Sequence, residues 1–226
     1  MLIFDFDGTV ALGDGPILAY ARGVAAELGD PDGFGARIDA VLAAQSAESL
    51  DGYDAVRRIA EEHGAEPAQL SRAFLASRAA LGTADAPVEA PEGLAAFLVE
   101  IAPAAERVLV TNSPAIRIVE ALASMGLDGL FDRIVTDAGK PAGLAAVLDA
   151  IPAAVPVLSI GDIWRNDLAP ARERGRDTAL VGAYADPAAA PTLRAADTAA
   201  LLPALRTWLA DAQTSVTDSL TTQSEG

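Results

Sequence analysis

The chain has 226 residues, and its 32 acidic residues outnumber its 16 basic ones, so its formal net charge is −16 at pH 7. An acidic surface argues against nucleic acids and anionic membranes as partners, while a hydrophobic content of 51% can bury a core and excludes a wholly disordered chain. The absence of cysteine excludes disulfides, thiolate catalysis and cysteine-bound metals, and a single histidine excludes multi-histidine metal sites.

The chain carries no sign of a membrane or secretory segment. No apolar run reaches the roughly 18 residues of a membrane span. Near the N-terminus, Asp5 and Asp7 stand where a signal peptide needs a basic and then an apolar stretch. We therefore expect a soluble, cytoplasmic protein.

The first predicted strand is the apolar run at residues 2–4, and the next strand-like run begins only at residue 108. Between them, amphipathic stretches predict helices at residues 16–28, 36–45, 53–63 and 67–81. We expect residues 12–85 to form a helical insertion, entered and left through linkers at residues 13–15 and 83–91. A further helix at residues 91–101 then leads back to the sheet.

The second half of the chain alternates strands and helices. Apolar runs predict strands at residues 108–110, 134–136, 155–160 and 179–181, and amphipathic stretches predict helices at residues 114–127, 141–151 and 168–174. Unbroken apolar runs are typical of parallel strands buried on both faces. The expected fold class is α/β, a doubly wound parallel sheet of residues 1–11 and 86–210, with residues 211–226 as a polar, disordered tail.

Polar residues follow several of these strands, at the carboxyl ends where open α/β sheets bind ligands. Asp5 and Asp7 end the first strand, Thr111 the second and Asp162 the fourth, and Lys140 opens the helix after the third. Crowded carboxylates repel unless a cation neutralises them, and hard oxygen ligands suit Mg²⁺. A metal, an ammonium and backbone N–H groups make a pocket for a phosphoryl group, in which one Asp can attack phosphorus while another protonates the leaving alcohol.

Four motifs then identify a family resemblance. Residues 5–9 read DFDGT, residues 108–112 read VLVTN, residues 139–141 read GKP and residues 161–167 read GDIWRND. In this order they resemble the signature motifs of the haloacid dehalogenase superfamily, and Lys140, the only lysine of the chain, falls on the family's lysine position. The resemblance covers the expected core, residues 1–11 and 86–210.

The resemblance implies a catalytic role for each matched residue. Asp5 would be the nucleophile, with its other oxygen on Mg²⁺. Asp7 would be the general acid and base, with its carbonyl oxygen on the metal. Thr111 and Lys140 would hold the phosphoryl oxygens. Further phosphate or substrate contacts would come from Gly8, Thr9 and Asn112.

The fourth motif supplies the remaining metal ligands under the same resemblance. Asp162 would bind Mg²⁺ directly. Asp167 would act through water or hydrogen bonds, and Asn166 could replace it in that role. The acid at Asp7 argues against the dehalogenase branch of the family, which lacks an acid at that position.

The helical insertion between the first two motifs resembles the family's C1 cap, which closes over the pocket and expels water. Where the family often has an acidic residue followed by serine, this chain reads ALGD at residues 11–14, so contacts of the cap with substrate are not predicted. Gln45, Ser46 and Tyr53 are candidate specificity residues in the insertion.

The expected function is Mg²⁺-dependent hydrolysis of a small-molecule phosphate monoester through an aspartyl-phosphate intermediate, with a small phosphorylated metabolite as partner. One alternative is a phosphomutase resembling the β-phosphoglucomutase branch. Another is a non-enzymatic phospho-acceptor, such as a signalling receiver domain, although a receiver's acceptor Asp follows a middle strand and the domain carries no cap. A third is a family member that only binds. The sequence predicts neither the particular ester nor the oligomeric state.

Overall fold

The computed structural model describes residues 1–29, 34, 51–182, 186 and 188–224, and of residues 215–224 it describes the backbone alone. Its centre is a six-stranded parallel sheet with the strand order β3-β2-β1-β4-β5-β6. The strands are β1 (Leu2–Phe4), β2 (Arg107–Val110), β3 (Arg133–Val135), β4 (Leu158–Gly161), β5 (Asp177–Leu180) and β6 (Leu193–Arg194). The chain order reverses at β1, which lies between β2 and β4, and such a switch point is where open α/β sheets bind ligands.

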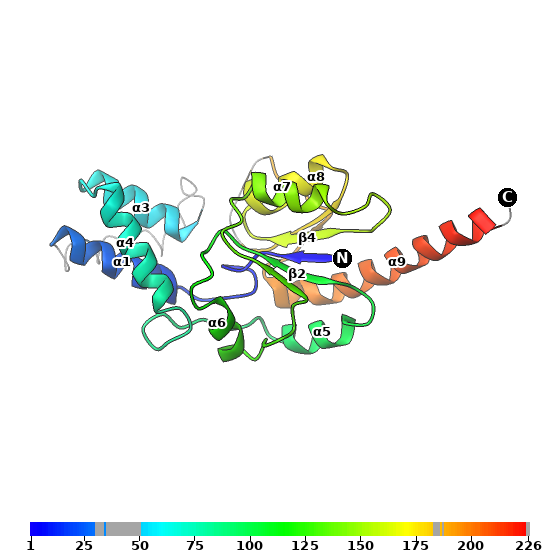
Figure 1. The fold of residues 1–226 in the computed structure, drawn as a ribbon, viewed down its shortest axis with the longest axis horizontal. Coiled ribbons are helices and arrows are strands. Elements are labelled where there is room, and N and C mark those ends of the chain that lie inside the picture. Colours follow the sequence, from blue (N-terminus) through cyan, green and yellow to red (C-terminus); the bar gives the residue numbers. More distant parts are fainter. Residues whose placement is uncertain (30–33, 35–50, 183–185, 187, 225–226) are drawn as a thin grey trace.

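Helices cover both faces of the sheet, so the expected doubly wound α/β fold is confirmed. Figure 1 shows α5 (Leu94–Ile101), α6 (Ile118–Ser124) and α9 (Thr198–Ser224) on one side, and α7 (Ala142–Asp149) and α8 (Ala169–Glu173) on the other. Side chains of β1 alternate between these layers: Leu2 and Phe4 pack with the first group, and Ile3 packs with the second. All three are buried, which explains the unbroken apolar run.

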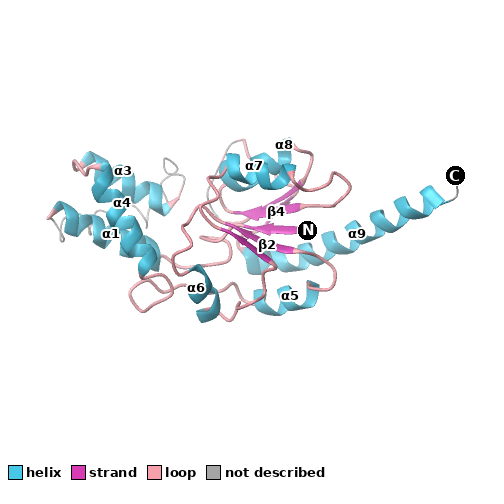
Figure 2. Cartoon of the chain, in the orientation of Figure 1, coloured by secondary structure: helices cyan, strands magenta, loops and turns pink. Residues whose placement is uncertain are grey.

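The residues between β1 and α5 form a helical unit with α1 (Gly15–Leu28), α3 (Gly52–Glu62) and α4 (Pro67–Ala79). It has a hydrophobic cluster of its own, in which Tyr20, Val24, Val56 and Leu70 are buried together. In Figure 2 the strand arrows point towards this unit, so it lies at the carboxyl ends of the strands. The helix expected at residues 36–45 and the candidates Gln45 and Ser46 lie outside the described residues.

The two segments that join the helical unit to the sheet run side by side. The Leu12 N–H donates to the Glu89 carbonyl oxygen at 2.8 Å, and the Glu89 N–H donates back at 3.0 Å. Close by, Gly15 packs so tightly that a Cβ atom there would lie 2.3 Å from the Pro87 carbonyl oxygen. The expected linkers at residues 13–15 and 83–91 are therefore in direct contact.

Two parts of the structure correct the expectations. Strand β3 is not buried on both faces, because it lies at the sheet edge, where Ile134 is 39% exposed. The prediction of a disordered tail is also wrong for residues 211–224, which continue α9. Adding residues to an existing helix avoids the unfavourable nucleation step, and neither proline nor glycine interrupts residues 204–224.

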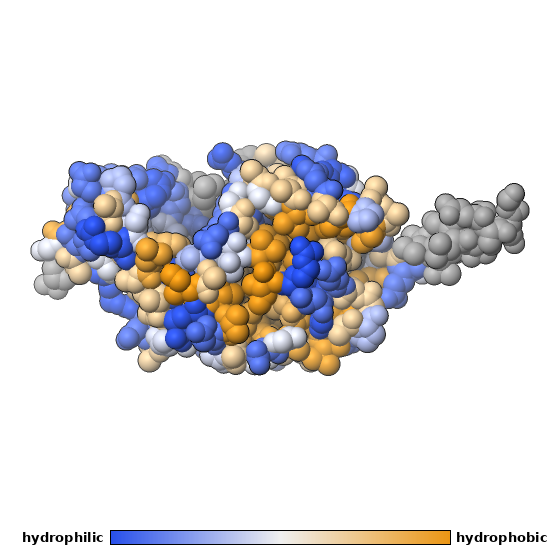
Figure 3. Space-filling view, in the orientation of Figure 1, coloured by the Kyte–Doolittle hydropathy of each residue, from blue (hydrophilic) through white to orange (hydrophobic). Residues whose placement is uncertain are grey.

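The outer surface mixes polar and apolar residues. Figure 3 shows apolar residues exposed across the middle of the viewed face and hydrophilic residues towards the outer end of the helical unit. The long helix α9 projects away from the rest of the molecule towards the C-terminus (Figure 1). Among the described helices, none has the length and apolar character needed to cross a bilayer.

Candidate active site

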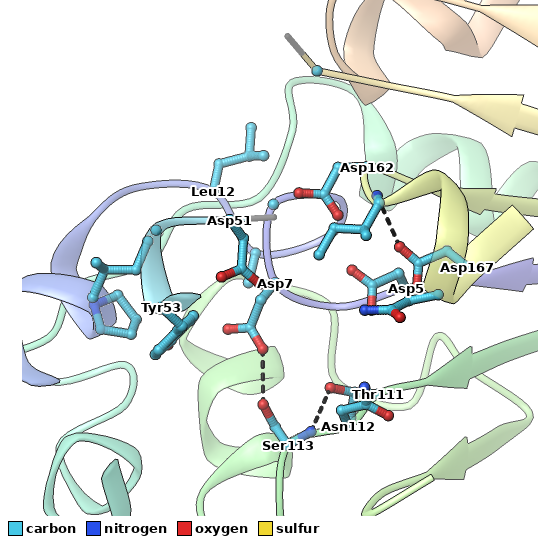
Figure 4. Close-up of a pocket in the computed structure, with 18 of the residues that line it drawn as sticks. Asp5, Asp7, Leu12, Asp51, Tyr53, Thr111, Asn112, Ser113, Asp162 and Asp167 are labelled. Atoms are coloured by element: carbon cyan, nitrogen blue, oxygen red, sulfur yellow. Dashed lines mark hydrogen bonds between the residues drawn. The ribbon is translucent and has the colours of Figure 1, made fainter. Parts of the chain in front are cut away.

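The polar residues expected at the sheet edge line one cavity of about 340 Å³ between the sheet and the helical unit (Figure 4). The core contributes Asp5, Asp7, Gly8, Thr111, Asn112, Ser113, Lys140, Asp162, Asn166 and Asp167. These residues come from the loops that follow β1, β2, β3 and β4, including the short π-helix η1 (Trp164–Leu168). The helical unit contributes Asp51, Tyr53 and Phe74. The cavity therefore has a polar floor on the sheet and a mixed wall on the helices.

Three buried carboxylates meet on this floor. Asp5, Asp162 and Asp167 each offer an oxygen, and these atoms all lie within 4.8 Å of one another. Burial raises the pKa of Asp5 to about 7, with Lys140 lowering it and Asp167 raising it further. Burial, followed by the charges of Asp5 and Asp167, likewise raises the pKa of Asp162 well above its ordinary value. A bound cation would remove this repulsion.

One oxygen of this group has no hydrogen-bonding partner. Asp162 Oδ1 is buried and lacks a donor among the described residues, whereas buried polar atoms are normally paired. Gly8 packs against the same carboxylate, with φ +78°, and a Cβ atom there would lie 2.4 Å from Asp162 Oδ2. The orphaned oxygen and the all-oxygen donor set fit a hard divalent cation such as Mg²⁺.

Lys140 lies among these acids. Its ammonium contacts Asp5 Oδ1 and donates to Asp167 Oδ1 at 2.6 Å. Burial lowers the pKa of Lys140, but the charges of Asp5 and Asp167 outweigh burial and raise it overall, so the ammonium form is stabilised. Its backbone N–H donates to Asn112 Oδ1 at 2.6 Å, so Asn112 fixes the loop that carries Lys140.

Asp167 rather than Asn166 provides the third carboxylate of the cluster. Asp167 Oδ2 accepts the Ile163 N–H at 3.0 Å, and the Asp167 carbonyl oxygen accepts the Ser159 hydroxyl at 2.7 Å. These bonds fix the π-helical turn that carries Asp167. Asn166 also lines the cavity, but the negative charge in the cluster comes from Asp167.

Thr9 does not lie in the cavity, where it was expected to contact phosphate or substrate. It is fully buried and is not among the described residues that line the cavity. Its hydroxyl donates to Asp5 Oδ2 at 3.4 Å, so it supports the carboxylate of Asp5 from behind. Thr111 does reach the cavity, and its hydroxyl oxygen accepts the Ser113 N–H at 3.0 Å.

The Asp7 carboxylate stands apart from the three clustered acids and is held at both oxygens. Ser113 Oγ donates to Oδ2 at 2.8 Å, and Arg78 Nη1 donates to Oδ1 at 2.9 Å. Arg78 belongs to α4, so this ion pair joins the helical unit to the sheet. The sequence reading missed Arg78, although Leu70, Phe74 and Arg78 follow one another at a four-residue spacing that places the charge on a buried helix face.

Comparison with known proteins identifies the fold. The chain matches no family model and no curated protein. It is similar to a haloacid dehalogenase-like hydrolase from Xanthomonas campestris, at 23% identity and a TM-score of 0.58, over 95% of this chain and 93% of that one. It is also similar to the candidate HAD-hydrolase YfnB from Bacillus subtilis, bound to magnesium, at 18% identity and a TM-score of 0.62, over 91% and 97%.

A third similar structure is a candidate β-phosphoglucomutase from Thermotoga maritima, at 19% identity and a TM-score of 0.55, over 91% of this chain and 98% of that one. All three identities lie below 25%, so the similarity concerns the fold. These similar structures include hydrolases and a candidate mutase, and the fold alone does not distinguish the two reactions.

Proposed function

We propose that this protein, which has the fold of the haloacid dehalogenase-like hydrolases, is a Mg²⁺-dependent phosphatase acting on small phosphate monoesters. The observation that carries the proposal is the buried group of Asp5, Asp162 and Asp167, in which Asp162 Oδ1 has no partner among the described residues and Lys140 contacts Asp5. An orphaned carboxylate oxygen beside a buried ammonium supports a site for a cation and a phosphoryl group together.

The residues that would hold Mg²⁺ are the carboxylates of Asp5 and Asp162 and the carbonyl oxygen of Asp7, with Asp167 in support. When bound, the ion would neutralise the crowded carboxylates and the phosphoryl oxygens. Lys140 and the Thr111 hydroxyl would hold further phosphoryl oxygens. Asn112 lines the same cavity, and its N–H group is a candidate for the same task. The Gly8 N–H, which was expected to share this task, donates instead to the Ala11 carbonyl oxygen at 2.9 Å.

The reaction would proceed in two steps at Asp5. An Asp5 carboxylate oxygen attacks phosphorus, the bond from phosphorus to the ester oxygen breaks, and the leaving oxygen takes a proton from Asp7. In the second step Asp7 takes a proton from water, the water oxygen attacks phosphorus, and the bond from phosphorus to Asp5 breaks. Inorganic phosphate and the free Asp5 carboxylate result, so protons and charge balance over the cycle.

The helical unit would serve as the cap of this site. Its residues Asp51, Tyr53 and Phe74 line the cavity opposite the catalytic floor, as Figure 4 shows for Asp51 and Tyr53. A wall of this kind excludes bulk water from the phosphoryl group and limits the size of the leaving alcohol. The substrate is therefore a small phosphorylated metabolite rather than a phosphorylated polymer.

Phosphate release from a panel of small esters tests the proposal. The wild type should release phosphate from p-nitrophenyl phosphate, β-glycerophosphate or phosphorylated sugars with Mg²⁺ and not with EDTA. Asp5→Asn should abolish release, because the amide is not a nucleophile at phosphorus. Asp149→Asn, which changes an exposed carboxylate paired with Arg174, is the matched control and should retain full activity. No release from any ester with Mg²⁺ present would contradict the proposal.

The phosphomutase alternative shares the first half of this mechanism. It differs in the acceptor, which would be a hydroxyl of a sugar phosphate instead of water. Product analysis with a sugar phosphate separates the two reactions: inorganic phosphate supports hydrolysis, and an isomeric sugar phosphate without phosphate release supports the mutase.

A further inference from the structure

We propose that Arg78 is a positioning residue that aims the carboxylate of Asp7 at the leaving group of the substrate. The inference rests on the proposed function, in which Asp7 transfers the proton. Arg78 does not line the described cavity, so it acts through Asp7 and does not bind substrate itself.

Arg78 bridges the helical unit and the catalytic loop through one nitrogen. Its Nη1 donates to Asp7 Oδ1 at 2.9 Å and to the Tyr53 hydroxyl at 2.9 Å. Tyr53 lies on α3, so Asp7 is tied to two helices of the unit at once. On the other side of the carboxylate, Ser113 Oγ donates to Asp7 Oδ2 at 2.8 Å.

The burial of Arg78 indicates a functional role for this side chain rather than a stabilising one. Its side chain is 0% exposed, and Nε and Nη2 have no hydrogen-bonding partner among the described residues. A buried guanidinium with unpaired N–H groups is unfavourable, and replacing a buried ion pair as a whole by apolar side chains of similar size is often neutral or stabilising. Among the described residues, the charged partner of Arg78 Nη1 is Asp7, which lines the cavity and whose side chain is 28% exposed.

The arrangement fixes the direction of proton transfer. With one donor at each oxygen, the Asp7 carboxylate cannot rotate freely, yet each oxygen keeps a second lone-pair direction for the reacting group. Much of the rate enhancement by a general acid depends on such orientation, because proton transfer requires the Asp7 oxygen and the leaving oxygen to lie at hydrogen-bond distance. Since Arg78 belongs to the helical unit, Asp7 is fully oriented only while that unit lies against the sheet.

The dependence on leaving group tests this role. Alkyl phosphates such as β-glycerophosphate need protonation of the departing oxygen, whereas p-nitrophenolate leaves readily without it. Arg78→Met should lower kcat/KM for β-glycerophosphate by about 10²-fold, within the range of general acid catalysis, and lower kcat/KM for p-nitrophenyl phosphate by less than about tenfold. Arg78→Lys keeps a donor and a charge, and should recover most of the loss.

The control is Arg72→Met on the same helix, which removes an arginine paired with Glu27 on the surface and should leave both values unchanged. Thermal unfolding of each variant separates folding defects from catalytic ones, and Arg78→Gln, which keeps a polar side chain but removes the charge, carries the comparison of the two esters if Arg78→Met does not fold. Equal loss on both esters, or no loss on either, in the variant that removes the charge would overturn the positioning role. A wild type that releases phosphate from no ester of the panel, sugar phosphates included, would instead contradict the proposed function, and the positioning role with it.

Discussion

The Lys140 ammonium contacts the Asp5 carboxylate, although the two residues are 135 positions apart in the chain. Both side chains are buried, and the same ammonium donates to Asp167. Burial alone would favour a neutral Asp5, and Lys140 opposes this effect on the Asp5 pKa. Lys140 therefore holds the proposed nucleophile in place and favours its reactive, ionised form.

Replacing Lys140 with methionine should remove this support. We expect kcat/KM for phosphate ester hydrolysis to fall by about 10²- to 10³-fold, the usual effect of deleting one group that stabilises charge in a transition state. Steady-state phosphate release measures the loss. Arg133→Met, at an exposed arginine of the sheet edge, is the control and should behave as wild type. A loss below threefold in Lys140→Met would contradict the role.

Replacing Asp162 with asparagine should change the response to metal. Without metal, the variant should unfold at a higher temperature than wild type, because one of three crowded carboxylates has been neutralised. At roughly 100-fold excess over its Kd, Mg²⁺ should raise the Tm of wild type by about 5–10 °C and leave that of the variant unchanged. Asp149→Asn should respond to Mg²⁺ as wild type does. An equal Mg²⁺ shift in Asp162→Asn would count against the metal site.

The metal-free protein should lose stability as pH rises. Burial raises the folded pKa of Asp5 to about 7, from an ordinary value of 3.8, so the folded state binds the proton more tightly than the unfolded state. This contribution to stability is fully present below about pH 4 and is lost as pH rises to about 7. In EDTA, the Tm of wild type minus the Tm of Asp5→Asn should therefore decrease as the pH is raised from about 5 to about 8, across the folded pKa of Asp5. A constant difference would contradict the raised pKa.

The ion pair of Arg107 with Asp132 should show the opposite dependence. Hydrogen bonds from the Arg107 side chain and backbone lower the pKa of Asp132 to about 2, so its stabilisation is present above 3.8 and lost as pH falls through about 2. Asp132→Asn should destabilise the protein at neutral pH by about 1 kcal/mol, allowing for a side chain that is 39% exposed. Denaturant unfolding should show this difference shrinking below pH 3.8. A difference independent of pH would contradict the assignment.

The sequence was sufficient to place the part of the site that lies on the sheet. Residues 5, 111 and 162 each follow a predicted strand, and the carboxyl ends of parallel strands share one edge. Two predictions failed for local reasons. Strand β3 is exposed because it lies at the sheet edge, and residues 211–224 are helical because they extend an existing helix. Thr9 is buried behind Asp5 because the turn after β1 points its hydroxyl inward, which strand periodicity does not predict.

The part of the site formed by the helical unit could not be predicted in this way. The contact of Arg78 with Asp7 spans 71 residues, and no local pattern states which helix face meets the catalytic loop. The spacing of Leu70, Phe74 and Arg78 shows only that the arginine lies on a buried face. Its partner depends on how the unit packs against the sheet.

The most direct test of the central claim is to trap the phosphoryl group on the chain. The protein should be mixed with p-nitrophenyl phosphate and Mg²⁺, quenched during turnover and treated with borohydride, which reduces an acyl phosphate to an alcohol. Peptide mass spectrometry should then find homoserine at residue 5, and none without Mg²⁺ or in Asp5→Asn. Reduction at another acidic residue, or an unmodified residue 5 in an actively hydrolysing sample, would contradict the central claim.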